Sequence, residues 1–179
     1  MRALLLGLLT LTLGAPALAQ AKGENIVMLV PDGFKLAHQA RDDTLTLVEF
    51  IPEGETVDDW SEMVTGMIIR KKPPTLQVFV DGMIEHYSAC ATHEEAKVEE
   101  GQTNGYPSAL WRMVCGETPD THKAEYLYMK VIYGADALYV VQDTFRGAPT
   151  PHHDVDALLY MKEVSACDTR TGDHPCPAQ

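Results

Sequence analysis

Three side chains that can bind a metal ion recur at helical spacing in the middle of the chain. His86, Cys90 and His93 stand at positions i, i+4 and i+7, and Glu94 follows directly. On a continuous helix these positions share one face, and imidazole and thiolate groups are common zinc ligands. The competing interpretation is structural, because a disulfide would occupy Cys90 and the helix is expected to end before His93. We favour the structural interpretation and expect no metal here.

A second cluster follows Pro151 and contains His152, His153, Asp154 and Asp156. Adjacent histidines point to different sides of a helix, so they cannot both bind one ion from regular helix. Acidic residues at a helix start interact favourably with the positive end of the helix dipole. We therefore expect both histidines on a solvated helix start, where replacing them together by alanine leaves the fold and partner binding nearly unchanged. Metal or proton chemistry at this pair is the alternative.

Other catalytic and cofactor-binding patterns are absent from the sequence. It contains no G-x-S-x-G nucleophile motif, no P-loop, no G-x-G-x-x-G, no H-E-x-x-H and no EF-hand loop. We therefore assign no catalytic, cofactor-binding or metal-binding residue, expect no cofactor, and favour a non-enzymatic binding or accessory protein. A small periplasmic hydrolase, or a metal-dependent enzyme that uses one of the histidine clusters, remains the alternative.

The four cysteines are Cys90, Cys115, Cys167 and Cys176. An even number in an exported chain predicts two disulfides, with three possible connectivities. Cys167 and Cys176 flank a short polar loop with glycine and proline, whereas Cys90 and Cys115 end a predicted helix and a predicted strand on apolar faces. This arrangement favours the pairs Cys90–Cys115 and Cys167–Cys176. No C-x-x-C motif is present, so a thioredoxin-type role has no support.

The N-terminus has the pattern of a secretory signal peptide. Arg2 precedes an uncharged apolar run over residues 3–13, and Ala17-Leu18-Ala19 supplies a small-residue cleavage site. We predict cleavage between Ala19 and Gln20, which leaves residues 20–179 as a single exported domain, periplasmic or secreted. A membrane anchor is the alternative, but the apolar run is too short to span a bilayer, and no later run is long enough.

Composition and charge restrict the partners. The chain has 179 residues, of which 45% are hydrophobic and 22% charged, which is ordinary globular usage. Its formal net charge of −12 disfavours binding to nucleic acid and to anionic membranes, since both would repel it. The expected partner is therefore another envelope protein or a small molecule.

The hydrophobic pattern predicts strands followed by a helix, then further strands and a second helix. The strands are expected at residues 26–30, 34–41, 44–51, 61–70, 109–115, 126–133 and 137–145. The first helix follows Pro73-Pro74 and carries apolar residues from Leu76 to Ala91. The second begins at Pro151 and carries Val155, Leu158, Leu159, Met161 and Val164. Residues 167–179 are expected to form a loop.

Short turns between consecutive strands permit only antiparallel pairing, and helices that cover such a sheet make an α+β layered domain. We therefore expect an antiparallel β-sheet covered by two main helices. This order resembles the PsbP-like small α/β sandwich, a fold shared by the photosystem II oxygen-evolving subunit, periplasmic DcrB proteins and a Ran-binding nuclear family. The segment from Phe50 to Thr65, FIPEGETVDDWSEMVT, is also similar to a motif of uncharacterised exported bacterial proteins. The resemblance implies a binding or accessory role and carries over no catalytic residue.

Overall fold

The computed structural model describes residues 22–90, 92–94, 96–118, 122–147 and 150–177. The expected signal peptide, with its cleavage site between Ala19 and Gln20, lies outside these residues. Within the described part of the chain, no helix is long and apolar enough to cross a membrane.

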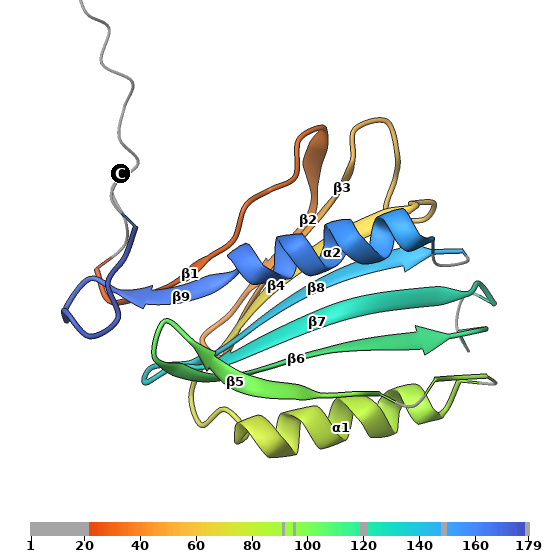
Figure 1. Cartoon of the computed structure of the whole chain (residues 1–179). Helices are drawn as coiled ribbons and strands as arrows, with labels where there is room; N and C mark the ends of the chain where they lie inside the picture. Colours follow the sequence, from red (N-terminus) through yellow and green to blue (C-terminus); the bar gives the residue numbers. More distant parts are fainter. Residues whose placement is uncertain (1–21, 91, 95, 119–121, 148–149, 178–179) are drawn as a thin grey trace, which may run out of the picture.

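Seven strands form one antiparallel sheet (Figure 1). They are β2 (Phe34–Arg41), β3 (Leu45–Pro52), β4 (Glu62–Ile69), β5 (Glu99–Thr103), β6 (Tyr106–Cys115), β7 (Glu125–Tyr133) and β8 (Leu138–Arg146). Their order is β2-β3-β4-β8-β7-β6-β5. The sheet therefore consists of two meanders, β2 to β4 and β5 to β8, which meet where β4 pairs with β8. Every pairing is antiparallel, as the short turns predict.

Two helices pack on opposite faces of this sheet. Helix α1 (Leu76–Ser88) begins after the N-cap Thr75, and helix α2 (Pro151–Glu163) begins after the N-cap Thr150. Each cap hydroxyl accepts a hydrogen bond from a backbone N–H of the first turn, which satisfies a donor that the helix leaves free. Helix α1 contacts β6 and β7, whereas α2 contacts β7 on the other face. The sheet thus dominates an α+β fold, and the helices cover less of it than the sequence pattern predicts.

The central strand β7 explains how the two faces are built. Leu127, Met129 and Val131 point toward α1 and are fully buried. Tyr126 and Ile132 lie on the opposite face and belong to the cluster around α2. Because successive side chains of a strand alternate between faces, a strand covered on both sides is apolar at nearly every position.

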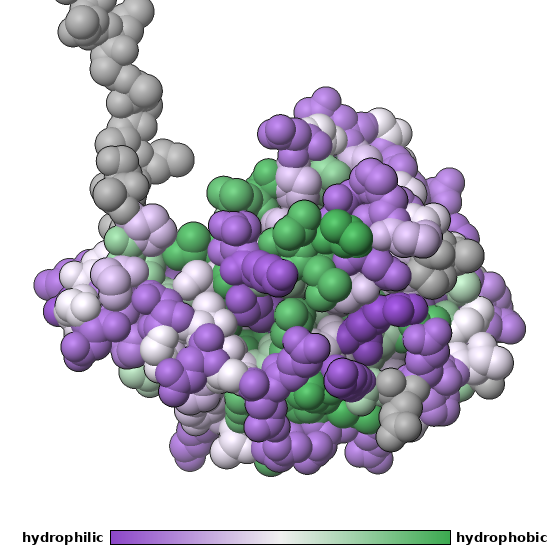
Figure 2. All heavy atoms as spheres, viewed as in Figure 1, coloured by the Kyte–Doolittle hydropathy of each residue, from purple (hydrophilic) through white to green (hydrophobic). Residues whose placement is uncertain are grey.

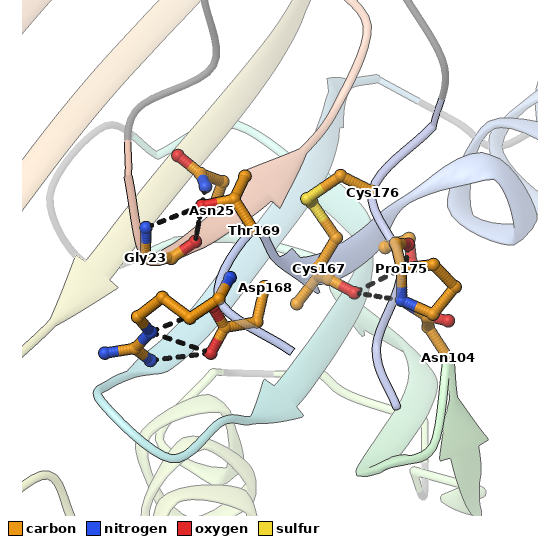
Figure 3. The surroundings of a disulfide bond; sticks show 11 residues. Gly23, Asn25, Asn104, Cys167, Asp168, Thr169, Pro175 and Cys176 are labelled. Atoms are coloured by element: carbon orange, nitrogen blue, oxygen red, sulfur yellow. Dashed lines mark hydrogen bonds and ion pairs between the residues drawn. A yellow bond between two sulfur atoms is a disulfide. The ribbon is translucent and has the colours of Figure 1, made fainter. Parts of the chain in front are cut away.

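A separate two-stranded sheet joins the two ends of the described chain. Strand β1 (Glu24–Val27) pairs with β9 (Ser165–Asp168), and the Cys167–Cys176 disulfide lies beside them (Figure 3). Gly23 N donates to Thr169 Oγ1 over 2.8 Å, which ties the start of β1 to the residue after β9. The expectation that residues 167–179 form only a loop is wrong for Cys167 and Asp168, because the long-range pairing with β1 extends a strand into them.

The second disulfide joins Cys90 to Cys115 across a Cα–Cα distance of 5.4 Å. Cys115 ends β6 on the face toward α1, and Cys90 lies just beyond the last residue of α1. Both disulfides therefore join the pairs that the sequence favours. Bridges of this kind persist in oxidising compartments and indicate an extracytoplasmic environment.

Strand β5 was not expected, because the sequence around it is acidic and lacks an apolar alternation. It is the edge strand of the large sheet, and all but Thr103 of its residues are exposed. Charged side chains suit such an edge because they discourage pairing with another chain. The turn into β6 is formed by Asn104 and Gly105, with φ values of 49° and 81°, as the Asn-Gly signal for a tight hairpin predicts.

Candidate functional site

A pocket of about 280 Å³ opens beside the first turns of α2, on the face of the sheet that this helix covers. Its walls are aromatic and apolar, and they come from the approach to β2, from β8 and from α2. These wall residues are Pro31, Phe34, Phe145 and Tyr160. Four polar residues, Glu62, Asp143, His153 and Asp156, also line it. The pocket therefore combines a small apolar enclosure with acidic groups and one imidazole.

Two of these acids, Glu62 and Asp143, form a pair in neighbouring strands. Glu62 in β4 stands opposite Phe145, and Asp143 in β8 stands opposite Val64. The two acids are therefore diagonal neighbours on the same face of the sheet, within reach of each other. They are hydrogen-bonded, which requires a proton between them because a carboxylate has no donor of its own.

Asp143 is the more deeply buried member of the pair. Only 3% of its surface is exposed, and its Oδ1 has no hydrogen-bond partner among the described residues. Burial, followed by the charge of Glu62 and the hydrogen bond to it, raises the pKa of Asp143 to about 8. Burial also raises the pKa of Glu62. At neutral pH the pair therefore carries one proton and one negative charge.

Both histidines are exposed at the start of α2, as the sequence predicts, but His153 also forms part of the pocket wall, which the sequence did not indicate. Its Nδ1 lies 2.6 Å from the hydroxyl of Tyr126 on β7. Its ring stacks on Phe145 with a centroid distance of 5.0 Å and an interplanar angle of 12°. The Nδ1 of His152 pairs with Asp156 of the next turn, at 2.6 Å. Adjacent helical positions thus separate the two histidines, as their spacing requires.

Exposed apolar side chains gather on α2, the helix that forms one wall of the pocket. Figure 2 shows hydrophobic side chains gathered over α2 and the neighbouring segment of the chain. Leu29 is 66% exposed, Val155 56% and Leu159 55%. Each is a close chain neighbour of a pocket residue, and Tyr160 Oη donates to Leu29 O over 2.9 Å. The expected apolar stripe of the second helix is therefore split: Met161 and the C-cap Val164 are buried, whereas Val155, Leu158 and Leu159 face outward.

The structure does not place the candidate metal ligands His86, Cys90 and His93 on one helix face. Helix α1 ends at Ser88, so Cys90 and His93 do not continue its face, and Cys90 is bonded to Cys115. His86 packs edge-on against the ring of Tyr87, whereas His93 forms an isolated bridge with Cys115. In the described part of the chain, no group of three or more histidine, cysteine or acidic residues could hold a metal ion.

His93 and Glu94 line another, larger pocket of about 480 Å³ beside the C-terminal end of α1. The rest of its wall includes Ile84, Tyr87 and Met113. Burial raises the pKa of the Tyr87 hydroxyl to about 12, so this group stays neutral. This pocket is mainly apolar and is lined by no buried acid, so it offers a ligand fewer specific polar contacts than the first pocket does.

Sequence reasoning missed Glu62 and Asp143. The two acids lie in strands from different meanders, and no local spacing relates them. One signal was present: Asp143 is an acid inside a strand that begins with the apolar run Leu138–Val141 and is largely buried, and a buried acid is costly. Its partner could not be identified without the β4–β8 pairing.

Comparison with known proteins gives similarity in structure only. No protein-family model matches the chain, and no curated protein matches it. Saccharomyces cerevisiae Ran-binding protein Mog1p is 16% identical, with a TM-score of 0.44, over 78% of this chain and 85% of that one. A point mutant of protein Mog1 gives 16% identity and a TM-score of 0.43, covering 75% of this chain and 78% of the other.

LpqN, involved in cell envelope biogenesis of Mycobacterium tuberculosis, is 12% identical with a TM-score of 0.41. The match covers 82% of this chain and 86% of LpqN. At identities and TM-scores this low, these similarities carry no argument about function. A functional proposal therefore has to rest on the chemistry of the pocket.

Proposed function

We propose that residues 20–179 are an exported, non-enzymatic binding or accessory protein of the cell envelope, periplasmic or secreted. Its ligand site is the pocket that contains Asp143 and Glu62. The observation that carries this proposal is the buried acid pair at an accessible, aromatic-lined pocket. Burying two acids side by side destabilises a fold, so their presence where a ligand can reach them favours a role in binding.

The apolar rim supports the same proposal. Exposed Leu29, Val155 and Leu159 are close chain neighbours of pocket residues, and contiguous apolar surface on a protein marks interaction sites. The pocket side chains that could act as nucleophiles are few, since none of the lining residues is serine, threonine or cysteine. Recognition therefore fits the pocket better than covalent catalysis.

An acid–base enzyme is the second candidate at the same pocket, because it places a proton-carrying acid near His153. A carboxyl pair with one shared proton can in principle activate water. Hydrolysis of aryl ester, glycoside or phosphate probes that disappears in Asp143→Asn would favour this candidate. Equal background rates for the wild type and the variant would argue against it.

The binding function is tested by thermal denaturation of the mature protein against a library of small cations, neutral compounds and anions. A ligand present at about 100 times its Kd should raise the Tm by about 5–10 °C. We expect the increase in Tm to be smaller in Asp143→Asn and unchanged in Glu100→Gln, which removes a charge from the exposed edge strand. If no compound raises the Tm, or if the increase is the same in Asp143→Asn as in the wild type, the result would contradict a ligand site in this pocket.

A further inference from the structure

We propose that the pocket binds a primary ammonium cation that carries a small apolar group, and that binding releases the proton shared by Asp143 and Glu62. The inference rests on the proposed binding function and specifies the class of ligand. It follows from three features of the pocket: the sign of its charge, a buried acceptor without a donor, and aromatic walls.

The charge of the pocket is negative. Glu62, Asp143 and Asp156 line it, and none of its lining residues is lysine or arginine. Asp156 is already paired with His152, whereas no lysine, arginine or histidine among the described residues forms an ion pair with Glu62 or Asp143. An incoming cation would therefore meet uncompensated acids, and the low dielectric of a partly enclosed site strengthens their attraction for it.

The buried acceptor distinguishes among cations. Oδ1 of Asp143 has no hydrogen-bond partner among the described residues, although the side chain is almost completely buried. A primary ammonium has three N–H donors and can satisfy this oxygen and Glu62 together. A quaternary ammonium has no donor and would leave Oδ1 without a partner, which is costly at a buried site.

The walls determine the rest of the ligand. Phe34, Phe145 and Tyr160 present aromatic surface beside the acids, which suits both an apolar group and the cation itself. A cavity of about 280 Å³ is at the small end of ligand pockets, so the ligand is a compact amine rather than a large molecule. The same chemistry could be offered by a lysine side chain of a partner protein, and the experiment separates the two sources.

The proton balance follows from the state of the pair. Before binding, one proton lies between the two carboxyl groups and the pair has a charge of −1. The ammonium arrives protonated and stabilises both carboxylates, so the shared proton passes to solvent and no covalent bond changes. Further titratable groups face the pair from three parts of the chain: Glu55 before β4, Tyr126 on β7, and His153, Asp156 and Tyr160 on α2. Parallel titrations of Asp143→Asn, which lacks the shared proton, separate the proton released by the acid pair from any released by these neighbours.

The test is isothermal titration calorimetry of the mature protein with phenethylamine, phenethyltrimethylammonium, 2-phenylethanol and Nα-acetyl-lysine amide. Each titration is done in two buffers that contain no primary amine and differ in ionisation enthalpy, phosphate and HEPES at pH 7 and borate and bicine at pH 9, so that the difference in heat counts the protons released. For a primary ammonium we expect nearly one proton released at pH 7 and few at pH 9. The affinity should rise about tenfold over this range and level off above pH 8.

Asp143→Asn keeps a donor toward Glu62 but cannot ionise. We expect it to fold, to bind phenethylamine at least tenfold more weakly, and to lose the pH dependence. Glu62→Gln serves as the second variant, and Glu100→Gln, which removes one exposed charge, should bind as the wild type does. Tighter binding of Nα-acetyl-lysine amide would identify a lysine side chain as the source of the ammonium, whereas tighter binding of phenethylamine would identify a free amine.

Equal binding of the alcohol or of the quaternary cation would overturn the proposal, as would binding without proton release. Failure of both primary ammonium probes would overturn it as well. The compound library tests the binding function separately from this inference. A neutral or anionic ligand whose binding depends on Asp143 would support a ligand site in the pocket and would contradict only the proposed class of ligand.

Discussion

The hydroxyl of Tyr126 lies 2.6 Å from Nδ1 of His153, and this contact fixes the first turn of α2 above the central strand β7. The backbone N–H of His153 also donates to the N-cap hydroxyl of Thr150. One residue therefore links the helix cap, the sheet and the stacked ring of Phe145 in the pocket wall. The start of α2 is held by specific contacts, and not by apolar packing alone.

This arrangement predicts different effects for the two histidines. His153→Ala should lower the free energy of unfolding by about 1–2 kcal/mol, because Tyr126 and Phe145 each lose their contact with the imidazole. His152→Ala is the matched control and should change it by less than about 0.5 kcal/mol, since this side chain is exposed. Urea denaturation monitored by circular dichroism measures both. Equal effects would show that the contacts of His153 contribute nothing.

The acid pair predicts a specific dependence of stability on pH. The folded-state pKa of Asp143 lies at about 8, above the value of an aspartate in the unfolded chain, so the unfolded state loses its proton first. The stability contributed by protonated Asp143 is therefore complete below about pH 4 and is lost as the pH rises toward 8. Glu62 shifts in the same direction.

Urea denaturation of the wild type and Asp143→Asn at pH 5, 7 and 9 isolates the contribution of the acid pair, because groups outside the pair titrate alike in both. The wild type should lose stability relative to the variant as the pH rises. A difference that stays constant from pH 5 to 9 would mean that Asp143 is ionised in the folded protein.

Much of the sheet could be predicted because its strands show either the apolar alternation of a half-buried strand, as in β2, or the continuous apolar run of a strand buried on both faces, as in β7. Strands β2, β3, β4, β7 and β8 lie within a residue or two of the expected ranges. Strands β5 and β9 could not be recognised in this way. The first is an exposed acidic edge, and the second is created by pairing with β1 from the other end of the chain.

The site was less predictable than the fold for a related reason. Asp143 and Glu62 meet only because the two meanders join at β4 and β8, which no local pattern reveals. The sequence identified His153 as a candidate for metal or proton chemistry. The residues that contact it, Tyr126 and Phe145, lie in other elements and could not be identified from its neighbours in the chain. The outward position of Val155 and Leu159 likewise depends on how α2 is rotated on the sheet, which the sequence periodicity does not specify.

Lys130 predicts a further test of how α2 is held. Its ammonium is buried on β7 and donates to the carbonyl oxygens of Met161 and Val164, at 2.9 and 2.7 Å. These carbonyls lie at the C-terminal end of α2, where the helix leaves acceptors free and its dipole favours a cation. Burial lowers the pKa of this lysine, so the two hydrogen bonds have to offset its desolvation.

We expect Lys130→Met to lower the free energy of unfolding by about 1–3 kcal/mol, because two buried acceptors lose their donor. Lys162→Met, on the exposed side of α2, is the matched control and should have little effect. Chemical denaturation compares the two, and hydrogen exchange of the last turn of α2 should increase only in the first. A neutral Lys130→Met variant would show that the methionine packs well enough to replace both hydrogen bonds.

The two disulfides should contribute unequally. The Cys90–Cys115 bridge spans 25 residues and joins the end of α1 to β6, whereas Cys167–Cys176 spans 9 residues. The loss of unfolded-state entropy corresponds to about 3.5 kcal/mol for the longer loop and about 2.6 kcal/mol for the shorter one. The shorter loop also has other anchors, since Asn104 Nδ2 donates to Ala166 O and Pro175 O, and Asp168 N donates to His174 O.

The double variant Cys90→Ala/Cys115→Ala should therefore unfold at lower urea concentration than Cys167→Ala/Cys176→Ala, with the wild type above both. Denaturation under oxidising conditions measures the order, and reduced wild type provides the reference without either bridge. The opposite order would mean that the C-terminal corner, where β1 pairs with β9, depends on its disulfide more than α1 depends on its own. In that case the hydrogen bonds of Asn104 and Asp168 do not hold the corner without the sulfur bridge.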